Sequence, residues 1–92
     1  MAEAEYQLRL FVSGTTPRSL RAVATVRRLC EKVLAGRFDL DVIDIYDHPA
    51  AARAAQIVAV PTLVKTAPAP KRLLVGDMTD GARLLAGLGL AG

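Results

Sequence analysis

A regular apolar pattern between Thr16 and Gly36 constrains the fold of this 92-residue chain more than any other feature. Its apolar residues recur every three or four positions, as on one face of an α-helix. They are Leu20, Val23, Val26, Leu29, Cys30, Val33 and Leu34. Thr16 is a suitable N-cap, Pro17 fits the first helical position, and Gly36 permits the left-handed residue that ends many helices. We therefore predict a long amphipathic helix from Pro17 to just before Gly36.

Strand patterns lie on both sides of this predicted helix. Residues 6–12 alternate between apolar and polar side chains, which is the period of a half-buried strand. Residues 40–46 carry apolar side chains on both faces, at Val42, Ile43 and Ile45, which is typical of a strand inside a sheet. A strand, a helix and a second buried strand predict a right-handed βαβ unit with parallel strands.

The second half of the chain predicts a short helix and two strands. Pro49 opens an alanine-rich segment that ends at Ala55 and has high helix propensity. Residues 63–66 and residues 71–75 are predicted to be strands, and the prolines between them make a stiff turn. We expect these two strands to pair antiparallel.

A last helix completes the predicted order of elements. Thr79 is its expected N-cap, and apolar residues follow at helical spacing. They are Ala82, Leu84, Leu85 and Leu88. The order βαβαββα is that of an α/β, thioredoxin-like fold. We expect a single domain over residues 1–92, with its core from about residue 6 to residue 88.

Composition excludes several classes of protein. Hydrophobic residues make up 52% of the chain and charged residues 23%, which is typical of a folded, soluble protein and not of a disordered one. The longest apolar stretches are short, such as residues 57–60, so we expect no membrane span. The acidic N-terminus predicts no secretory signal, and the one cysteine, Cys30, permits no internal disulfide. We expect a cytoplasmic protein.

Charge is unevenly distributed along the chain. Residues 17–37 contain six basic residues and one acid, whereas residues 39–47 contain four aspartates and no basic residue. Such a layout suits a polar protein partner as well as a polyanion. Because basic residues do not alternate with aromatic ones and no RNA-binding motif occurs, we expect no nucleic-acid partner.

The sequence offers no catalytic or metal-binding set of residues. Redox proteins of this fold place a reactive cysteine at the start of the first helix. Residues 13–18 contain no cysteine, and Cys30 falls on the apolar stripe instead. His48 stands alone in a turn, and no nucleophile is fixed beside the aspartates of residues 39–47. We expect no enzymatic activity, no metal and no cofactor.

Pro61 lies in a Val-Pro-Thr segment that opens a predicted strand, opposite the first strand–helix loop. Thioredoxin-like domains carry a cis-proline at this place. The alternative is an ordinary trans proline at the start of a strand. Because the whole order of elements fits, we predict that the Val60–Pro61 bond is cis.

Five segments of the chain form a more specific combination. They are residues 10–19, 42–45, 57–65, 68–72 and 75–80. Together they resemble the KaiB family of circadian-clock proteins, and the likeness runs from about Tyr6 to Leu88 without a gap. The resemblance implies a non-enzymatic regulator, in a circadian, timing or stress system, that binds the hexameric ATPase KaiC. In clock systems it also implies displacement of a sensor histidine kinase and capture of KaiA.

The resemblance also assigns roles to particular residues. Arg21, Lys65 and Arg72 match basic positions of the family and are expected to contact the ATPase. On the second strand, Asp41 replaces a basic residue that is linked to KaiA docking, which weakens the case for a KaiA partner. Gly87-Leu88-Gly89 stands where the family commonly has Gly-Leu-Asp, in the region that takes part in a fold switch.

That fold switch, also implied by the resemblance, exchanges the thioredoxin-like state for a tetrameric state of order βαββααβ. In the tetrameric state the stretch after Pro49 becomes a strand. Residues 50–55 are five alanines and one arginine, which form a poor strand and a good helix. We therefore expect the thioredoxin-like state to dominate in the isolated chain.

Two other functions remain open at this point. The chain could be a stand-alone, sensor-type KaiB-like domain of a clock histidine kinase system. It could also be a thioredoxin-fold protein of redox origin that has lost thiol chemistry.

Overall fold

The computed structural model describes residues 4–76 and 78–90, and its elements follow the predicted order. They are β1 (Tyr6–Val12), α1 (Pro17–Val33), β2 (Phe38–Asp44), α2 (Pro49–Ala54), β3 (Thr62–Ala67), β4 (Arg72–Val75) and α3 (Gly81–Gly87). The prediction of an α/β, thioredoxin-like order is confirmed. No helix among the described residues is long and apolar enough to cross a membrane.

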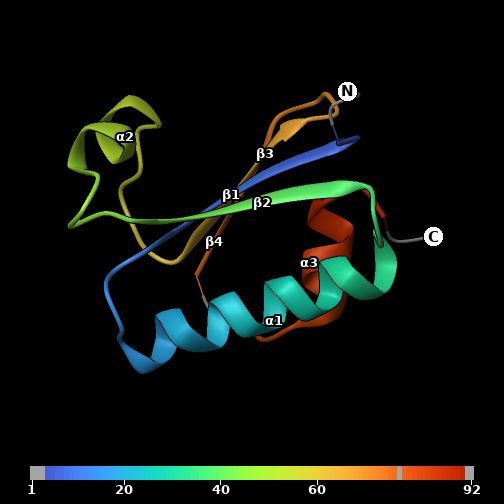
Figure 1. Cartoon of the computed structure of the whole chain (residues 1–92), viewed down its shortest axis with the longest axis horizontal. Coiled ribbons are helices and arrows are strands. Elements are labelled where there is room, and N and C mark those ends of the chain that lie inside the picture. The colour runs from blue at the N-terminus through green and yellow to red at the C-terminus, as the bar shows by residue number, and fades with distance from the viewer. Residues whose placement is uncertain (1–3, 77, 91–92) are drawn as a thin grey trace.

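The four strands form one mixed sheet in the order β2-β1-β3-β4. β1 and β2 are parallel, with Leu8 opposite Leu40, as the βαβ pattern predicts. β3 runs antiparallel to both β1 and β4. Figure 1 shows α1 and α3 on the same side of the sheet, whereas α2 lies beyond one end of it on the other side.

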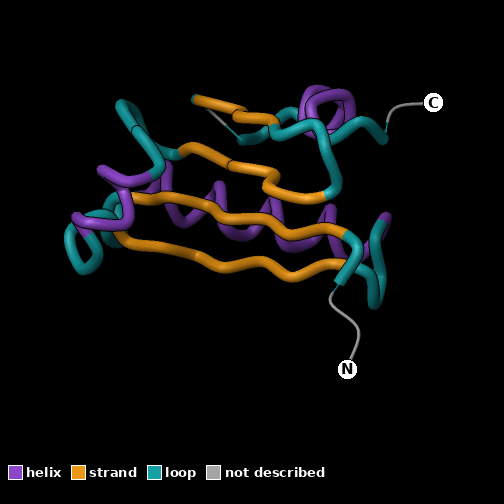
Figure 2. The backbone as a smooth tube through the Cα atoms, turned by 90° about the horizontal axis from the view of Figure 1, so that it is seen from above, coloured by secondary structure: helices purple, strands orange, loops and turns teal. Residues whose placement is uncertain are grey.

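β2 is an edge strand, so the prediction that it lies inside the sheet is wrong (Figure 2). β2 also begins and ends two residues earlier than predicted. The turn at Gly36 is short, and pairing with β1 starts directly after it, where the amide of Tyr6 donates to the carbonyl of Arg37 at 2.9 Å. β1 has β2 on one side and β3 on the other, and no described strand lies beyond β2. Val42 is consequently 39% exposed.

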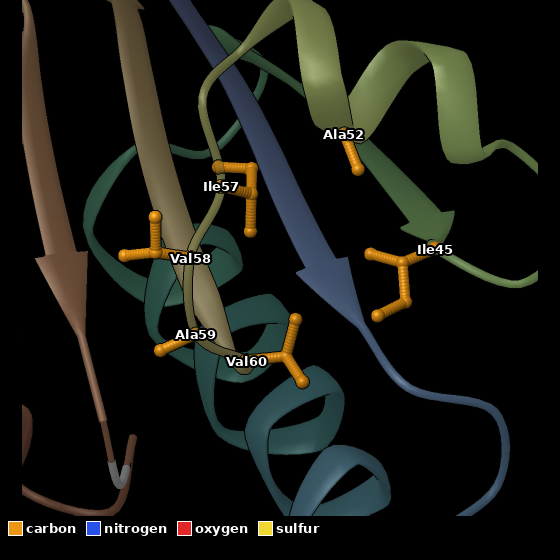
Figure 3. A pocket seen from close by; sticks show the side chains of 6 residues that line it. All are labelled: Ile45, Ala52, Ile57, Val58, Ala59 and Val60. Carbon is orange, nitrogen blue, oxygen red and sulfur yellow. The ribbon is translucent and has the colours of Figure 1, made fainter.

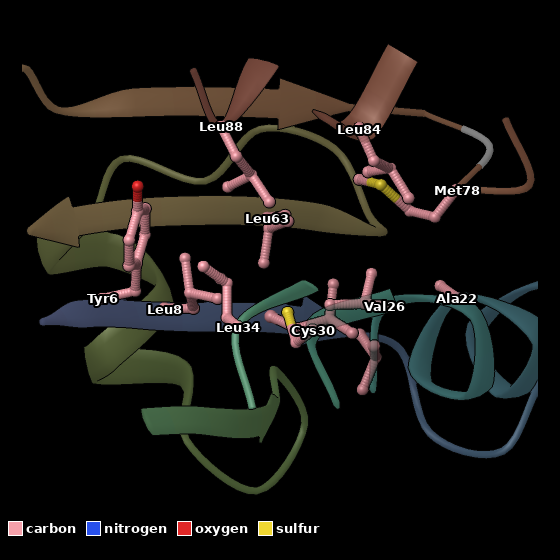
Figure 4. Packing of buried hydrophobic residues seen from close by; sticks show 12 residues of the cluster. Tyr6, Leu8, Ala22, Val26, Cys30, Leu34, Leu63, Met78, Leu84 and Leu88 are labelled. Atoms are coloured by element: carbon pink, nitrogen blue, oxygen red, sulfur yellow. The ribbon is translucent and has the colours of Figure 1, made fainter. Parts of the chain in front are cut away.

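The core lies between one face of the sheet and the two helices α1 and α3 (Figure 4). Leu8 and Leu10 on β1 and Leu63 on β3 face α1 and α3. The helices and their flanks contribute Ala22, Val26, Cys30, Leu34, Met78, Leu84 and Leu88. Each leucine buried in this way stabilises the fold by about 1.5–3 kcal/mol relative to an exposed one.

The buried stripe of α1 differs from the predicted one at its start. Leu20 is 56% exposed, and Ser19 and Ala22 are buried in its place. The hydroxyl of Ser19 accepts a hydrogen bond from the amide of Ser13 at 3.1 Å, so this polar side chain is satisfied inside the core. In the first turn of α1, Ser19 and not Leu20 is therefore the buried residue, and its hydroxyl is bonded to the loop before the helix.

One of the two predicted helix N-caps is confirmed and the other is wrong. Thr16 caps α1, and its hydroxyl accepts from the amide of Ser19 at 3.3 Å, as predicted. Gly36 follows α1 with a positive φ of 73°. The cap of α3 is Asp80 and not Thr79, because the Asp80 carboxylate accepts from the amide of Arg83 at 3.2 Å.

Candidate partner-binding surface

The three basic residues expected to contact a partner lie in two different places. Lys65 on β3 and Arg72 on β4 are cross-strand neighbours, and Lys65 also pairs with Leu8, so both lie on the sheet face that packs against the helices. Arg21 is exposed near the start of α1. The structure therefore brings Lys65 and Arg72 together and leaves Arg21 on a separate element.

Burial also separates Lys65 from the other two. Arg21 and Arg72 are exposed, whereas Lys65 is 5% exposed. A long lysine side chain buries its methylene groups against apolar neighbours while its ammonium group stays near the surface. Substitution of Lys65 therefore changes packing as well as charge, which makes Arg72 the cleaner probe of a binding role.

The outer side of α1 carries most of the basic charge noted in the sequence. Its exposed cations are Arg18, Arg21, Arg27, Arg28 and Lys32. Arg37 pairs with Glu5 at 3.5 Å outside α1, and within the described part of the chain the cations of α1 form no ion pair. The charge of this helix is therefore free to attract an acidic partner surface at low ionic strength.

Pro61 lies at the start of β3, and the bond between Val60 and Pro61 is cis. Its ring is buried, and its carbonyl accepts from the amide of Gly76 at 3.1 Å. The next residue, Thr62, donates its hydroxyl to the carbonyl of Ala59 at 2.5 Å. These bonds fix the segment before β3 to the end of β4.

A small apolar groove opens beside this segment, as Figure 3 shows. Its volume is about 150 Å³, and it is lined by Ile45, Ala52, Ile57, Val58, Ala59 and Val60. Val58 is 95% exposed, and Tyr46, next to the lining residue Ile45, is 74% exposed. Sequence reasoning missed this surface, although the run of apolar residues before Pro61 was a usable signal.

Cys30 is buried in the core and is not available for thiol chemistry (Figure 4). Burial, with a smaller contribution from the charge of Glu31, raises the pKa of the Cys30 thiol to about 11. The thiolate, which is the nucleophile, is therefore scarce at neutral pH. Cys30 acts as a small apolar side chain between α1 and the sheet.

The aspartates and the histidine are not arranged for catalysis. Asp39 and Asp41 are exposed on the edge strand β2. The Asp44 carboxylate accepts from the amide of Tyr46 at 2.9 Å and so stabilises the turn after β2. His48 is exposed and precedes α2 without a side-chain cap bond. The described residues contain no group of three or more ligands that could hold a metal ion.

Gly87, Leu88 and Gly89 form the end of α3. Gly87 is its last residue, and a Cβ atom there would overlap the side chain of Leu74 on β4. Leu88 is 2% exposed and contributes to the core, whereas Gly89 has a positive φ of 77°. This segment therefore anchors α3 to the sheet through a close approach that the missing side chain permits.

Comparisons with known proteins agree on one family. The family model KaiB domain matches residues 9–90. The circadian clock oscillator protein KaiB of Prochlorococcus marinus (strain MIT 9313) is 45% identical over 92% of this chain and 71% of its own length. KaiB of Nostoc sp. (strain PCC 7120) is 42% identical over 97% of this chain and 82% of its own length.

Solved structures extend the likeness to the fold. The N-terminal domain of Synechococcus elongatus SasA is 31% identical, with a TM-score of 0.76, over 97% of this chain and 88% of that domain. Mitochondrial thioredoxin 3 of Saccharomyces cerevisiae has the same TM-score at 14% identity, covering 95% of this chain and 79% of its own. The second likeness concerns the fold alone. From the family match and the clock-protein relatives together, the chain belongs to the KaiB family of circadian clock proteins.

Proposed function

We propose that this protein is a non-enzymatic regulator that binds a KaiC-like ATPase ring through protein–protein contacts in the cytoplasm. The observation that supports this most is the KaiB match over residues 9–90 on a chain in the thioredoxin-like state. That is the state which the family resemblance links to KaiC binding. The buried, protonated Cys30 offers no competing thiol function.

The positions of the basic residues indicate where the ring would bind. Arg72 and Lys65 form one basic position, and Arg21 with the rest of the outer side of α1 forms another. An acidic surface on the ring would meet these cations, so the affinity should fall as salt is added. Asp41 is exposed on β2, and its negative charge argues against a KaiA partner at that strand.

A pull-down with the cognate KaiC-like ATPase tests the proposal. Arg72→Glu and Arg21→Glu should each weaken capture of the ring, because each places a negative charge opposite an acidic surface. Arg9→Glu is the matched control: Arg9 is exposed on β1, and its neighbour Leu8 faces the core, so Arg9 points to the opposite sheet face. Cys30→Ala should leave capture unchanged.

Two results would contradict the proposal. Failure of the unmodified chain to bind the ring contradicts the function itself, whereas Arg72→Glu and Arg21→Glu binding as well as Arg9→Glu contradicts the assignment of these two residues to the interface. Lys65→Met complements the set because it removes the charge while it keeps most of the buried volume. A buried glutamate at Lys65 would confuse lost binding with lost folding.

A second candidate function is a sensor-type KaiB-like domain of a histidine kinase system, and the likeness to the SasA N-terminal domain favours it. A competition experiment for binding to the ring distinguishes the two functions. A KaiB-type regulator should displace a SasA-type domain from the ring, and it should also exchange slowly with a tetramer. A sensor-type domain should stay in the thioredoxin-like state at all concentrations.

The proposed fold switch would involve Gly87, Leu88 and Gly89, because it must release α3 from the sheet. Backbone chemical shifts and the mass in solution report on it. Helical shifts at residues 50–55 and extended shifts at residues 63–65 identify the thioredoxin-like state. The reverse pattern with a tetrameric mass identifies the alternative state.

A further inference from the structure

The segment that forms one wall of the groove has free main-chain groups. The amides of Val58, Ala59 and Val60 make no hydrogen bond to any described residue, although those of Gln56 and Ile57 on one side donate to carbonyls of α2. Val58 and Ala59 are also exposed. Free amides in an accessible segment are available to pair with the main chain of another molecule.

The size of the groove limits what it binds. Pockets that bind small molecules usually have volumes of about 300–1,000 Å³. The groove measures about 150 Å³, which is too small for such a ligand and suits one or two inserted side chains. A stable complex between folded proteins involves about 20–30 residues on each side, so these few lining residues form only part of a larger interface with a protein partner.

The chemistry of the lining limits the occupant further. No charged side chain contributes to the groove, and its walls are aliphatic: Ile45, Ala52, Ile57, Val58, Ala59 and Val60 (Figure 3). A charged side chain inserted here would lose water without gaining a partner. The lining is therefore complementary to an uncharged, apolar side chain.

We propose that the groove beside Pro61 binds an extended, apolar segment of the protein partner, which pairs its main chain with Val58 and Ala59 and inserts an apolar side chain between Ile45 and Val60. The inference rests on the proposed function, because the partner is the KaiC-like ring. It adds a second, uncharged contact that is independent of Arg21 and Arg72. Affinity for the ring should then persist in part at high salt.

Substitutions at Val58 test the groove, because this side chain is 95% exposed and its replacement leaves the core intact. Val58→Asp and Val58→Lys should each weaken ring binding about tenfold or more, whereas Val58→Ile should stay within about twofold. The pair of opposite charges is the internal control. An effect of simple electrostatics would make one variant weaker and the other tighter.

Amide hydrogen exchange tests the main-chain pairing. In the free protein the amides of Val58 and Ala59 should exchange fast, and in complex with the ring they should slow about tenfold or more. The amide of Ile57 already donates to Ala52 at 3.0 Å, so it should change less and serves as the reference.

The outcomes separate the two proposals. If the unmodified chain does not bind the ring, the proposed function fails and the groove proposal falls with it. If the unmodified chain binds but Val58→Asp and Val58→Lys bind equally well, the groove proposal alone is overturned. Unchanged exchange at Val58 and Ala59 in the complex would overturn the main-chain pairing.

Discussion

The two halves of this molecule are held together in different ways. In the first half, α1 has 17 residues and buries four of them. In the second half, α2 has six residues and buries none, and α3 has seven residues and buries Leu84 alone. The helices of the second half therefore have few buried side chains, which lowers the free energy needed to open them locally.

The difference extends to the strands. β1 is central, and its residues Leu8, Leu10 and Phe11 are almost completely buried. β4 is a four-residue edge strand with Leu73 and Val75 partly exposed. Each edge strand keeps unpaired main-chain groups, so the stability of the sheet resides at β1 and β3.

Truncation of one buried leucine in each half gives the largest expected effect. Leu10→Ala in β1 should lower the free energy of unfolding by about 2–5 kcal/mol, because it leaves a cavity at the centre of the sheet. Leu84→Ala removes the same atoms from an equally buried site on α3, but we expect α3, with one buried residue, to open while the sheet and α1 persist. Urea denaturation should therefore give a smaller loss for Leu84→Ala. Equal losses of unfolding free energy for the two variants would show that the two halves unfold together.

Alkaline pH should weaken the first half through Cys30. The folded pKa of about 11 lies above the ordinary value of 9.0, so the unfolded chain loses the thiol proton first as the pH rises. The contribution of the protonated thiol is complete below about pH 9 and is lost between about pH 9 and 11, by at most about 2–3 kcal/mol.

The matched variant for this pH effect is Cys30→Val, which keeps an apolar side chain at the same place in α1. The difference in unfolding free energy between the native chain and this variant should shrink or reverse as the pH rises from 9 to 11. A difference that stays constant with pH would show that Cys30 titrates alike in both states.

The first half was also the more predictable one. The spacing of Val26, Cys30 and Leu34, with Thr16 and Gly36 at the ends, was enough to place α1, because an amphipathic helix leaves a local signature. Whether β2 lies inside or at the edge of the sheet is decided by strand order, which local patterns do not contain. The exposure of Leu20 escaped prediction for a similar reason, since Ser19 is buried by a bond from a loop.

For the candidate site, the sequence identified the basic residues but not which of them are buried. Arg21 and Arg72 are exposed, as a binding role requires, whereas the burial of Lys65 follows from its pairing with Leu8 and Arg72 across three strands. The groove depends on α2 folding over the end of the sheet. The apolar run before Pro61 marks this segment in the sequence, but the sequence does not show that the run is exposed.

Removal of the two helix caps gives the smallest expected effect and tests whether α3 opens independently of α1. Thr16→Ala removes the hydroxyl that accepts from the amide of Ser19, which should cost about 1 kcal/mol and lower the melting temperature by about 4–8 °C. Asp80→Ala removes the equivalent bond to the amide of Arg83 in α3. Its local cost is similar, but a short helix with one buried residue can open without the rest of the molecule.

The measurement for both caps is amide hydrogen exchange combined with thermal unfolding. After Thr16→Ala, exchange should accelerate throughout β1 and α1, and the melting temperature should fall. After Asp80→Ala, acceleration should be confined to α3, with a smaller fall in melting temperature. Thr16→Ser and Asp80→Asn keep a capping oxygen and should restore most of each loss. If Asp80→Ala accelerates exchange in β1 as strongly as Thr16→Ala does, α3 is part of the same cooperative unit as α1, and the second half has no independent freedom to rearrange.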